Sequence, residues 1–172
     1  MSASPALRDD DDLLMTPAGY ERLRDELELL RTVRRAALTE QLRETREDGD
    51  PDNPLLFDLL EEQAQLESRI SLLEAQVVSA QVVRHAADGS AGIGSSVRVR
   101  HCDSGDVAEY DLVGPIESDA GNRRVSVEAP VGRALLGRVC GDTVVVDTPR
   151  GPTRLEVLAV SAAGAADVKE AA

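Results

Sequence analysis

The first half of the chain contains a long stretch with apolar residues at helical spacing. These residues follow one another at alternating steps of three and four: Tyr20, Leu23, Leu27 and Leu30. This spacing places them on one face of an α-helix. Thr16 followed by Pro17 is a typical helix start, and no glycine or proline interrupts residues 20–48. The pattern predicts a helix over residues 16–47, although its apolar stripe weakens before Leu38.

A second helix is predicted after a short turn. Asn53 can cap its first turn, and Pro54 suits the first helical position. A heptad stripe with one polar member follows: Leu56, Leu59, Gln63, Leu66, Ile70, Leu73 and Val77. We expect this helix to continue toward residue 84. Two long helices with narrow stripes and a short connection favour an antiparallel coiled-coil hairpin, with the turn "REDGDPDN" at its far end.

From residue 96 the apolar period changes to two, which is typical of strands. The candidate strands are separated by turn residues: "SVRVRH", "VAEYDLV", "RRVSVE", "TVVVDT" and "TRLEVLAV". Before the fourth of them, Val131, Ala134 and Leu135 are spaced for one face of a short helix. The sequence therefore predicts an α+β fold, in which the helical hairpin is followed by a small antiparallel β-sheet with one short helix.

These patterns divide the chain into five parts. The hairpin is expected at residues 15–84 and the sheet domain at 96–161. Residues 85–95 are rich in glycine and serine and are expected to be a linker. Residues 1–14, with four consecutive aspartates, and residues 162–172 carry no apolar pattern and are expected to be disordered tails.

Composition and charge narrow the classes of function. With three aromatic residues and no tryptophan, the core must be aliphatic. The net charge of −13 opposes binding to free nucleic acid, so a role on nucleic acid would act through a partner protein or a local basic patch. We find no membrane-spanning stretch and no secretory signal. We therefore expect a cytoplasmic protein in which Cys102 and Cys140 are free thiols. We also expect it to be a monomer.

Common catalytic motifs are missing from the sequence. It has no dinucleotide-binding or P-loop glycine pattern, no CxxC and no HExxH. His101 and Cys102 are neighbours on a predicted strand, so their side chains point to opposite faces. The chain alone thus carries no complete active site.

The turn between the two helices is crowded with acids. Glu47, Asp48, Asp50 and Asp52 fall within six residues. One interpretation is a solvated turn, since aspartate, asparagine, glycine and proline are common turn residues. The other is metal handling, because Mg²⁺ is held by one or two carboxylates together with waters and substrate phosphates. In that case a partner would have to supply the rest of the site.

Three segments resemble the Gre family (GreA/GreB) of bacterial factors that bind RNA polymerase. "MTPAGYERLRDELELLRTV" is similar to the family's opening, and "TREDGDPDNPLLFDLLEEQ" stands in the place of its acidic tip. "VGPIESDAGNRRVSVEAPVGRALLGRVCGDTVVVDTPRG" is similar to the family's long C-terminal signature. The resemblance implies a coiled-coil hairpin followed by an FK506-binding-protein-like domain.

The resemblance also implies a mechanism. The hairpin would enter the polymerase secondary channel, and tip carboxylates would share a Mg²⁺ ion with the polymerase active site, so that the polymerase cuts its own backtracked RNA. The factor would bind no cofactor alone and would not itself be an enzyme. Asp50 matches the first tip aspartate of the family, and Asp52 or Asn53 takes the place of its glutamate. Glu47 and Asp48 are further candidates. Because this tip is altered, a regulator that occupies the channel and inhibits transcription without supporting cleavage is the alternative.

Other positions carry over from the family with competing structural interpretations. Asp119 and Pro130 match positions linked to polymerase docking, although they also suit a turn acid and a helix start. Arg31, Arg34 and Arg35 make the first helix locally basic, and the resemblance implies that they guide the 3′ end of the nascent RNA. The alternative is a solvated helix face with ion pairs.

Overall fold

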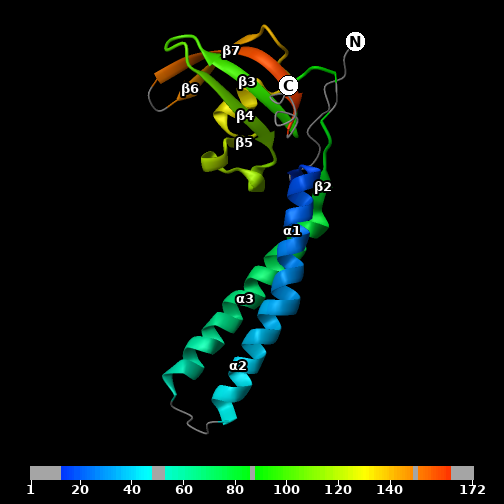
Figure 1. Cartoon of the computed structure of the whole chain (residues 1–172), viewed down its shortest axis with the longest axis vertical. Coiled ribbons are helices and arrows are strands. Elements are labelled where there is room, and N and C mark those ends of the chain that lie inside the picture. The colour runs from blue at the N-terminus through cyan, green and yellow to red at the C-terminus, as the bar shows by residue number, and fades with distance from the viewer. Residues whose placement is uncertain (1–12, 48–52, 86–87, 149–150, 164–172) are drawn as a thin grey trace, which may run out of the picture. The chain divides into compact units, whose positions relative to one another are not determined.

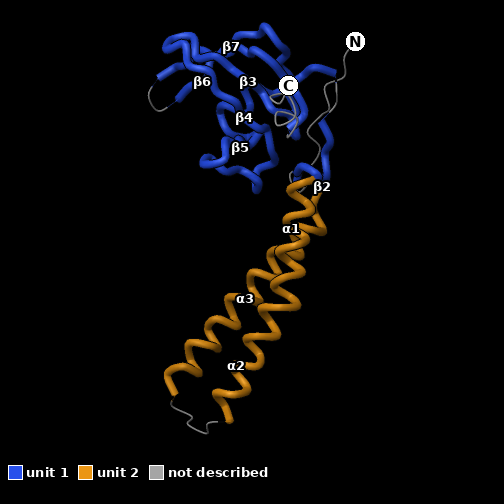
Figure 2. Tube along the Cα trace, in the orientation of Figure 1, with its two compact units in different colours: residues 1–17, 81–172 blue, residues 18–80 orange. Residues whose placement is uncertain are grey.

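The computed structural model describes residues 13–47, 53–85, 88–148 and 151–163 (Figure 1). These residues divide into two compact units (Figure 2). The hairpin unit lies within residues 18–80, and the sheet unit combines residues up to Pro17 with those from Gln81 onward. The α+β fold class predicted from the sequence is confirmed. In the described part of the chain, no helix is long and apolar enough to cross a membrane.

The hairpin unit is built from two antiparallel helical arms. The first arm comprises α1 (Pro17–Leu29), a π-helical turn (Leu30–Arg34) and α2 (Arg35–Glu47). The second arm is α3 (Pro54–Ser79). Near the far end, an apolar cluster joins α2 to α3: Leu38, Leu42 and Leu59, with Leu56 and Leu66 packed against them.

The π-helical turn corrects the prediction of one uninterrupted helix over residues 16–47. The heptad run that includes Leu27 and Leu30 would continue at positions 34, 37 and 41. The chain instead places half-buried or buried residues one position later, at Arg35, Leu38 and Leu42. The first arm therefore contains one extra residue. A π-turn takes in such a residue, so Leu38 and Leu42 still pack against α3.

The second arm ends earlier than expected. α3 stops at Ser79, and Ala80–Val82 form the short strand β2 instead of continuing the helix toward residue 84. β2 pairs with β1 (Leu13–Met15), and the backbone N–H of Val83 donates to the carbonyl of Met15 at 2.8 Å. Part of the predicted N-terminal tail, up to residue 14, is therefore a strand.

The sheet unit contains a five-stranded sheet with the order β5-β4-β3-β7-β6. Its strands are β3 (Ser95–His101), β4 (Val107–Val113), β5 (Arg124–Ser126), β6 (Thr143–Thr148) and β7 (Gly151–Ala162). β4 and β5 pair in parallel, whereas the other neighbours are antiparallel. The sheet is therefore mixed and not purely antiparallel as predicted, because the chain crosses over between β4 and β5 before pairing again.

The core of the sheet unit is aliphatic, as the composition requires. Strand residues alternate inward, and Leu135 of α4 (Pro130–Leu135) is fully buried among them. Two residues of the predicted linker also belong to this core: Ala91 is 2% exposed and Ile93 is 8% exposed. Backbone hydrogen bonds join Ala91 to Gly137 and Arg138. The second part of residues 85–95 is therefore packed structure and not a free linker.

A buried carboxylate attaches the N-terminal segment to the rest of the sheet unit. Glu117 accepts hydrogen bonds from Thr16 N at 2.7 Å and Thr16 Oγ1 at 2.6 Å. It also accepts from Gly114 N at 3.2 Å and Arg124 Nη2 at 3.1 Å. The Glu117 side chain is only 4% exposed. Gly114 lies so close to Leu14 that an added Cβ would stand 1.8 Å from the Leu14 carbonyl oxygen.

Candidate functional site

The far end of the hairpin holds the main candidate site. α2 ends at Glu47 and α3 begins at Pro54. Asp48, Asp50 and Asp52 lie between them, outside the described residues, so their assignment as metal-handling carboxylates stays a prediction.

Glu47 has a partner within the chain. Its carboxylate forms an ion pair and hydrogen bond with Arg43, and Arg43 also binds Glu40 at 2.6 Å. These hydrogen bonds, above all the one that Arg43 donates to Glu40, raise the pKa of Arg43 above its ordinary value. The arginine in turn lowers the pKa of Glu40. Arg43 of α2 thus balances the charge of Glu47.

Asn53 has a clear structural role at the start of α3. Its side-chain Oδ1 accepts a hydrogen bond from Leu55 N at 3.0 Å, and its carbonyl accepts one from Leu56 N at 3.0 Å. This is the arrangement of an N-cap residue, followed by a proline at the first position. Asn53 therefore has a structural role, and whether Asp52 or Asn53 takes the place of the family's second tip acid stays a prediction. Phe57, on the first turns of α3, is 60% exposed.

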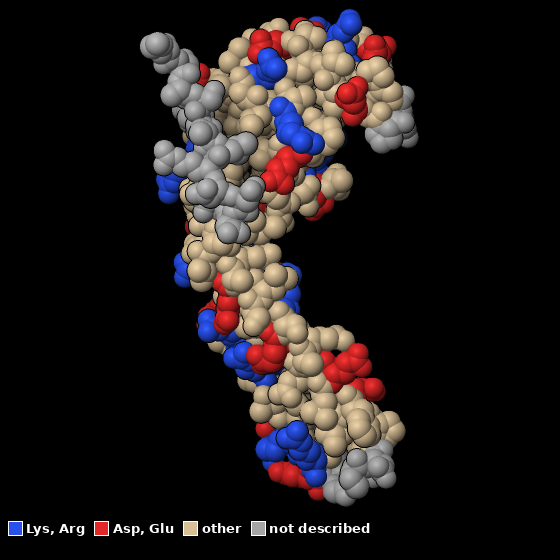
Figure 3. All heavy atoms as spheres, turned by 180° about the vertical axis from the view of Figure 1, so that it is seen from behind, with Lys and Arg blue, Asp and Glu red and all other residues tan. Residues whose placement is uncertain are grey.

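An open groove of about 470 Å³ lies between the two arms close to this end. Six residues line it: Thr39, Leu42, Arg43, Arg46, Glu47 and Gln63. Basic and acidic side chains gather together at this end of the hairpin (Figure 3). In the sequence, this groove is indicated by Gln63, the polar member of the heptad stripe. Its polar side chain makes the seam between the two arms less apolar at this level. Among the described residues, no group of three or more histidine, cysteine or acidic side chains is placed to hold a metal ion.

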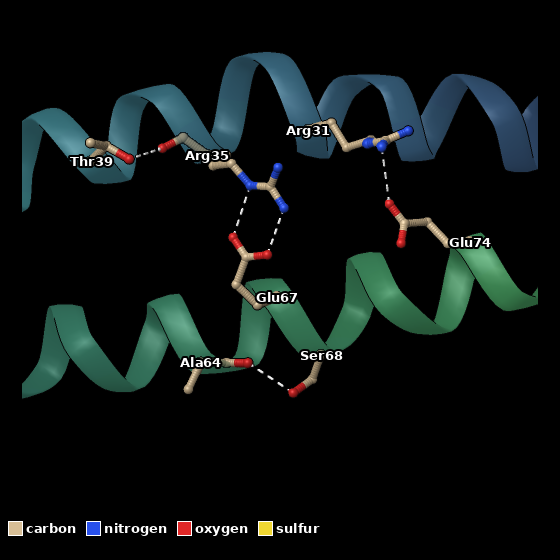
Figure 4. A network of polar contacts seen from close by, with 7 residues as sticks. All are labelled: Arg31, Arg35, Thr39, Ala64, Glu67, Ser68 and Glu74. Atoms are coloured by element: carbon tan, nitrogen blue, oxygen red, sulfur yellow. Dashed lines mark hydrogen bonds and ion pairs between the residues drawn. The ribbon is translucent and has the colours of Figure 1, made fainter.

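The three arginines assigned to RNA guidance brace the two arms together. Arg31 pairs with Glu74 at 3.2 Å, Arg34 with Glu62 at 3.0 Å and Arg35 with Glu67 at 2.6 Å. Figure 4 shows two of these pairs crossing from the first arm to α3. The Arg35 guanidinium is bidentate, and its hydrogen bond to Glu67 is the main cause of its raised pKa. The ion-pair interpretation gains support, with partners on the other helix, and RNA guidance stays a prediction.

Asp119 is exposed, but its carboxylate organises its own loop. One oxygen accepts from Gly121 N at 3.0 Å and Asn122 N at 3.3 Å, and the other accepts from Asn122 Nδ2 at 2.6 Å. The Asn122 side-chain hydrogen bond is the main reason why the pKa of Asp119 is lowered. Arg123, which follows, adopts a left-handed conformation with φ 56° that non-glycine residues rarely take. Asp119 therefore has a structural role whether or not it contacts a partner.

Pro130 occupies the first turn of α4 and is exposed. Its fixed φ suits this position, where a backbone N–H would have no helical partner. Both predicted docking positions thus lie in the connection between β4 and β6, each at the start of a helical turn. Their contact with a partner stays a prediction. Glu117, two residues before Asp119, was not singled out by the sequence because its partner Thr16 is 101 residues away.

Comparisons with known proteins agree along nearly the whole chain. The family model for the N-terminal part of transcription elongation factors matches residues 13–82. The model for the C-terminal part of the GreA/GreB transcription elongation factors matches residues 86–162. Together they cover both units. The chain belongs to the GreA/GreB family of transcription elongation factors.

Curated relatives carry the same family name. The chain is 37% identical over 155 residues to a transcription elongation factor GreA of Alkaliphilus oremlandii, which covers 88% of this chain and 98% of the relative. It is 39% identical over 152 residues to a GreA of Nitratidesulfovibrio vulgaris, covering 86% and 93%. Among solved structures, GreA factor homolog 1 (Gfh1) of Thermus thermophilus is 33% identical, covers 87% of this chain and 99% of that chain, and has a TM-score of 0.41.

Proposed function

We propose that this protein binds bacterial RNA polymerase and inserts the far end of its hairpin into the secondary channel. There, Asp50 and Asp52 would reach the polymerase active site and stimulate cleavage of backtracked RNA. Membership of the transcription elongation factor family supports this proposal. The observation that carries it is the position of the acidic segment between the end of α2 and the start of α3. α3 alone has 26 residues, or roughly 39 Å at ~1.5 Å per residue.

The carboxylates would act on a Mg²⁺ ion that is shared with the polymerase. Such an ion, when bound, stabilises the attacking or leaving oxygen in phosphoryl transfer. Magnesium in these sites usually takes one or two carboxylates, together with waters and phosphate oxygens. Two aspartates on a tip would therefore be half of a site, and the polymerase would supply the other half. The contribution of this chain is to hold the two carboxylates in place.

The described residues beside the tip limit which side chains take part. Arg43 engages Glu47, and Asn53 caps α3, so both of these side chains already have a role within the chain. An aspartate in the position of the family's glutamate is one methylene shorter. Because a misplacement of about 1 Å can lower the rate by a large factor, the tip backbone would have to come closer to the shared Mg²⁺ ion to make up for the shorter side chain.

A cleavage assay on stalled polymerase tests the proposal. RNA polymerase halted in a backtracked complex is mixed with the protein and Mg²⁺, and short RNA fragments released from the 3′ end are measured. We expect fragments with the native chain and loss of most of this activity with Asp50→Ala or Asp52→Ala. Asp58→Ala is the matched control, because Asp58 is an exposed acid on α3 just past the tip.

Two other outcomes would contradict the cleavage proposal. Slower nucleotide addition without released fragments would mean that the hairpin occupies the channel and inhibits transcription. A chain that does not bind polymerase would rule out both activities.

For docking, Asp119→Asn is a better probe than a charge reversal, because the asparagine keeps an oxygen that can accept from Gly121 N. Weaker binding of polymerase by this variant would support the contact.

A further inference from the structure

The apolar seam of the hairpin is interrupted in its middle. The π-helical turn Leu30–Arg34 contains no buried residue, whereas Leu27 before it and Leu38 after it are buried. In α3, Leu66, which packs against the distal leucines, and Gln63, which lines the groove nearer the tip, are only half-buried. Two buried groups lie on either side. The distal block is defined by Leu38, Leu42 and Leu59, and the proximal block by Leu23, Leu27, Ile70 and Leu73.

Ion pairs replace apolar contacts between these blocks. Three of them cross the arms here, formed by Arg31, Arg34 and Arg35 with glutamates of α3. The paired side chains are between 42% and 59% exposed. Exposed pairs of this kind contribute little to stability, and salt screens them. Their long side chains also tolerate displacement of the two backbones, which a packed leucine seam does not.

The backbone hydrogen bonding of the first arm is irregular at the same level. The N–H of Arg35 donates to the carbonyl of Leu30, five residues back, as in a π-turn. Thr32 Oγ1 donates to the carbonyl of Glu28 at 2.7 Å, and Thr39 Oγ1 to that of Arg35 at 2.8 Å. Threonine bonds of this type bend helices, and π-turns within α-helices are frequent at functional positions.

The sequence fixes the position of this turn. If the extra residue moved toward the tip, Gln41 and Glu44 would enter the seam in place of Leu42 and Thr45, which are buried. If it moved toward the base, Glu28 would replace Leu27. Both shifts would bury charged or polar side chains. The interruption is therefore specified by leucines on its two sides.

We propose that residues 30–35 form a bending joint, about which the distal block moves as a unit relative to the proximal block. Each block keeps its own buried leucines, and only the half-exposed ion pairs and the π-turn rearrange during the movement. The direction in which the far end of the hairpin points would then vary without local unfolding of either block. The joint follows from the hairpin itself and does not depend on the proposed action of the tip.

Amide hydrogen exchange, followed by NMR on the whole chain, tests the joint. Local opening exposes amides according to the local stability of each segment. We expect the amides of residues 33–36 to exchange at least about tenfold faster than those of residues 41–44 and 26–28. This ratio should grow when salt is raised from 0.05 to 1 M, which shortens the Debye length from more than ~10 Å to ~3 Å. Screening weakens ion pairs in all three segments, but the reference segments also have the buried residues Leu27 and Leu42. Equal protection along the arm would overturn the proposal.

Two variants connect the effect to the π-turn and to the polar seam. Deleting Thr32 removes the extra residue and makes the heptad continuous, so exchange at the joint should slow to the rate of its neighbours. Thr32→Ala is the matched control, since it removes the same side chain and its hydrogen bond to Glu28 but keeps the extra residue, so exchange should stay much closer to that of the native chain than to that of the deletion. Arg35→Leu should slow exchange by extending the apolar seam. A deletion variant that unfolds, or that still exchanges rapidly at this level, would contradict the joint.

Discussion

Replacing Thr16 by valine tests whether the buried Glu117 carboxylate holds the N-terminal segment. Valine has nearly the same shape as threonine and lacks only the hydroxyl that donates to Glu117 Oε1 at 2.6 Å. The Thr16 backbone N–H keeps its bond to Oε2 at 2.7 Å, and Arg124 continues to donate to Oε1. The substitution therefore removes one donor to a carboxylate and creates no cavity.

The size of the effect follows from burial and charge. Thr16 is 7% exposed and Glu117 is 8% exposed. A hydrogen bond to a charged group contributes about 1.5–3 kcal/mol, so we expect Thr16→Val to lower the free energy of unfolding by about 2 kcal/mol. Glu117→Gln should cost more, about 3 kcal/mol. Each oxygen of the Glu117 carboxylate accepts from two donors, and in glutamine an NH₂ group would face one of these two pairs. Arg124 would also lose the negative charge with which it pairs.

The measurement must report on the sheet unit alone. In a Tyr20→Phe background, Tyr110 on β4 is the remaining tyrosine of the chain, and it packs against the core of that unit. Urea unfolding followed by its fluorescence gives the free energy for each single variant and for the double variant. Because both side chains share one interaction, the cycle should show a coupling of about 1–2 kcal/mol. A loss below about 0.5 kcal/mol for Thr16→Val, or additive effects, would refute the reasoning.

Three further changes are expected to have defined effects. Gly114→Ala should destabilise the sheet unit by about 3 kcal/mol or more in the same urea titration, because its Cβ would stand 1.8 Å from the Leu14 carbonyl oxygen. Gly92→Ala is the control and should be tolerated, because the atom nearest to its added Cβ is 3.9 Å away. Asn53→Ala should lower helix stability by about 1 kcal/mol, measured by thermal unfolding followed by circular dichroism, and Asn53→Asp should not. The pKa of Asp119 is lowered by hydrogen bonds, so its loop is stabilised above the ordinary aspartate pKa, and this contribution is lost as pH falls through the folded-state pKa. An NMR titration of its carboxyl carbon with a midpoint at or above the ordinary value would contradict this.

The hairpin could be predicted from the sequence because its signal is local. Heptad spacing and the cap at Asn53 identify α3 and its start. The weakening of the stripe before Leu38 was visible as well, and it marks the extra residue that the π-turn takes in. Its consequence for the backbone could not be foreseen, since an insertion in a heptad can be absorbed by a π-turn or by local unwinding of the coiled coil.

Features that depend on distant partners were missed. Ala80–Val82 continues a helical pattern in sequence and becomes a strand only because residues 13–15 pair with it. The parallel pairing of β5 with β4 likewise depends on the path of the chain between them. In the site, the arginines were recognised as a basic group, but their glutamate partners lie on the other helix, 28 to 43 positions away. Local spacing therefore identifies a charged group without showing what balances it.

The position of Pro17 in the sheet unit has a consequence for chain topology. Residues 13–17 and 81–163 belong to one unit, so the hairpin is an insertion within that unit and not a domain that precedes it. A fragment that starts after the hairpin would lack β1 and would leave Glu117 without its Thr16 donors. Conversely, β1 and β2 are paired, so the chain leaves and re-enters the sheet unit at neighbouring strands. A short loop from Pro17 to Gln81 could close this gap, giving a hairpin-free protein with which to separate what each unit contributes.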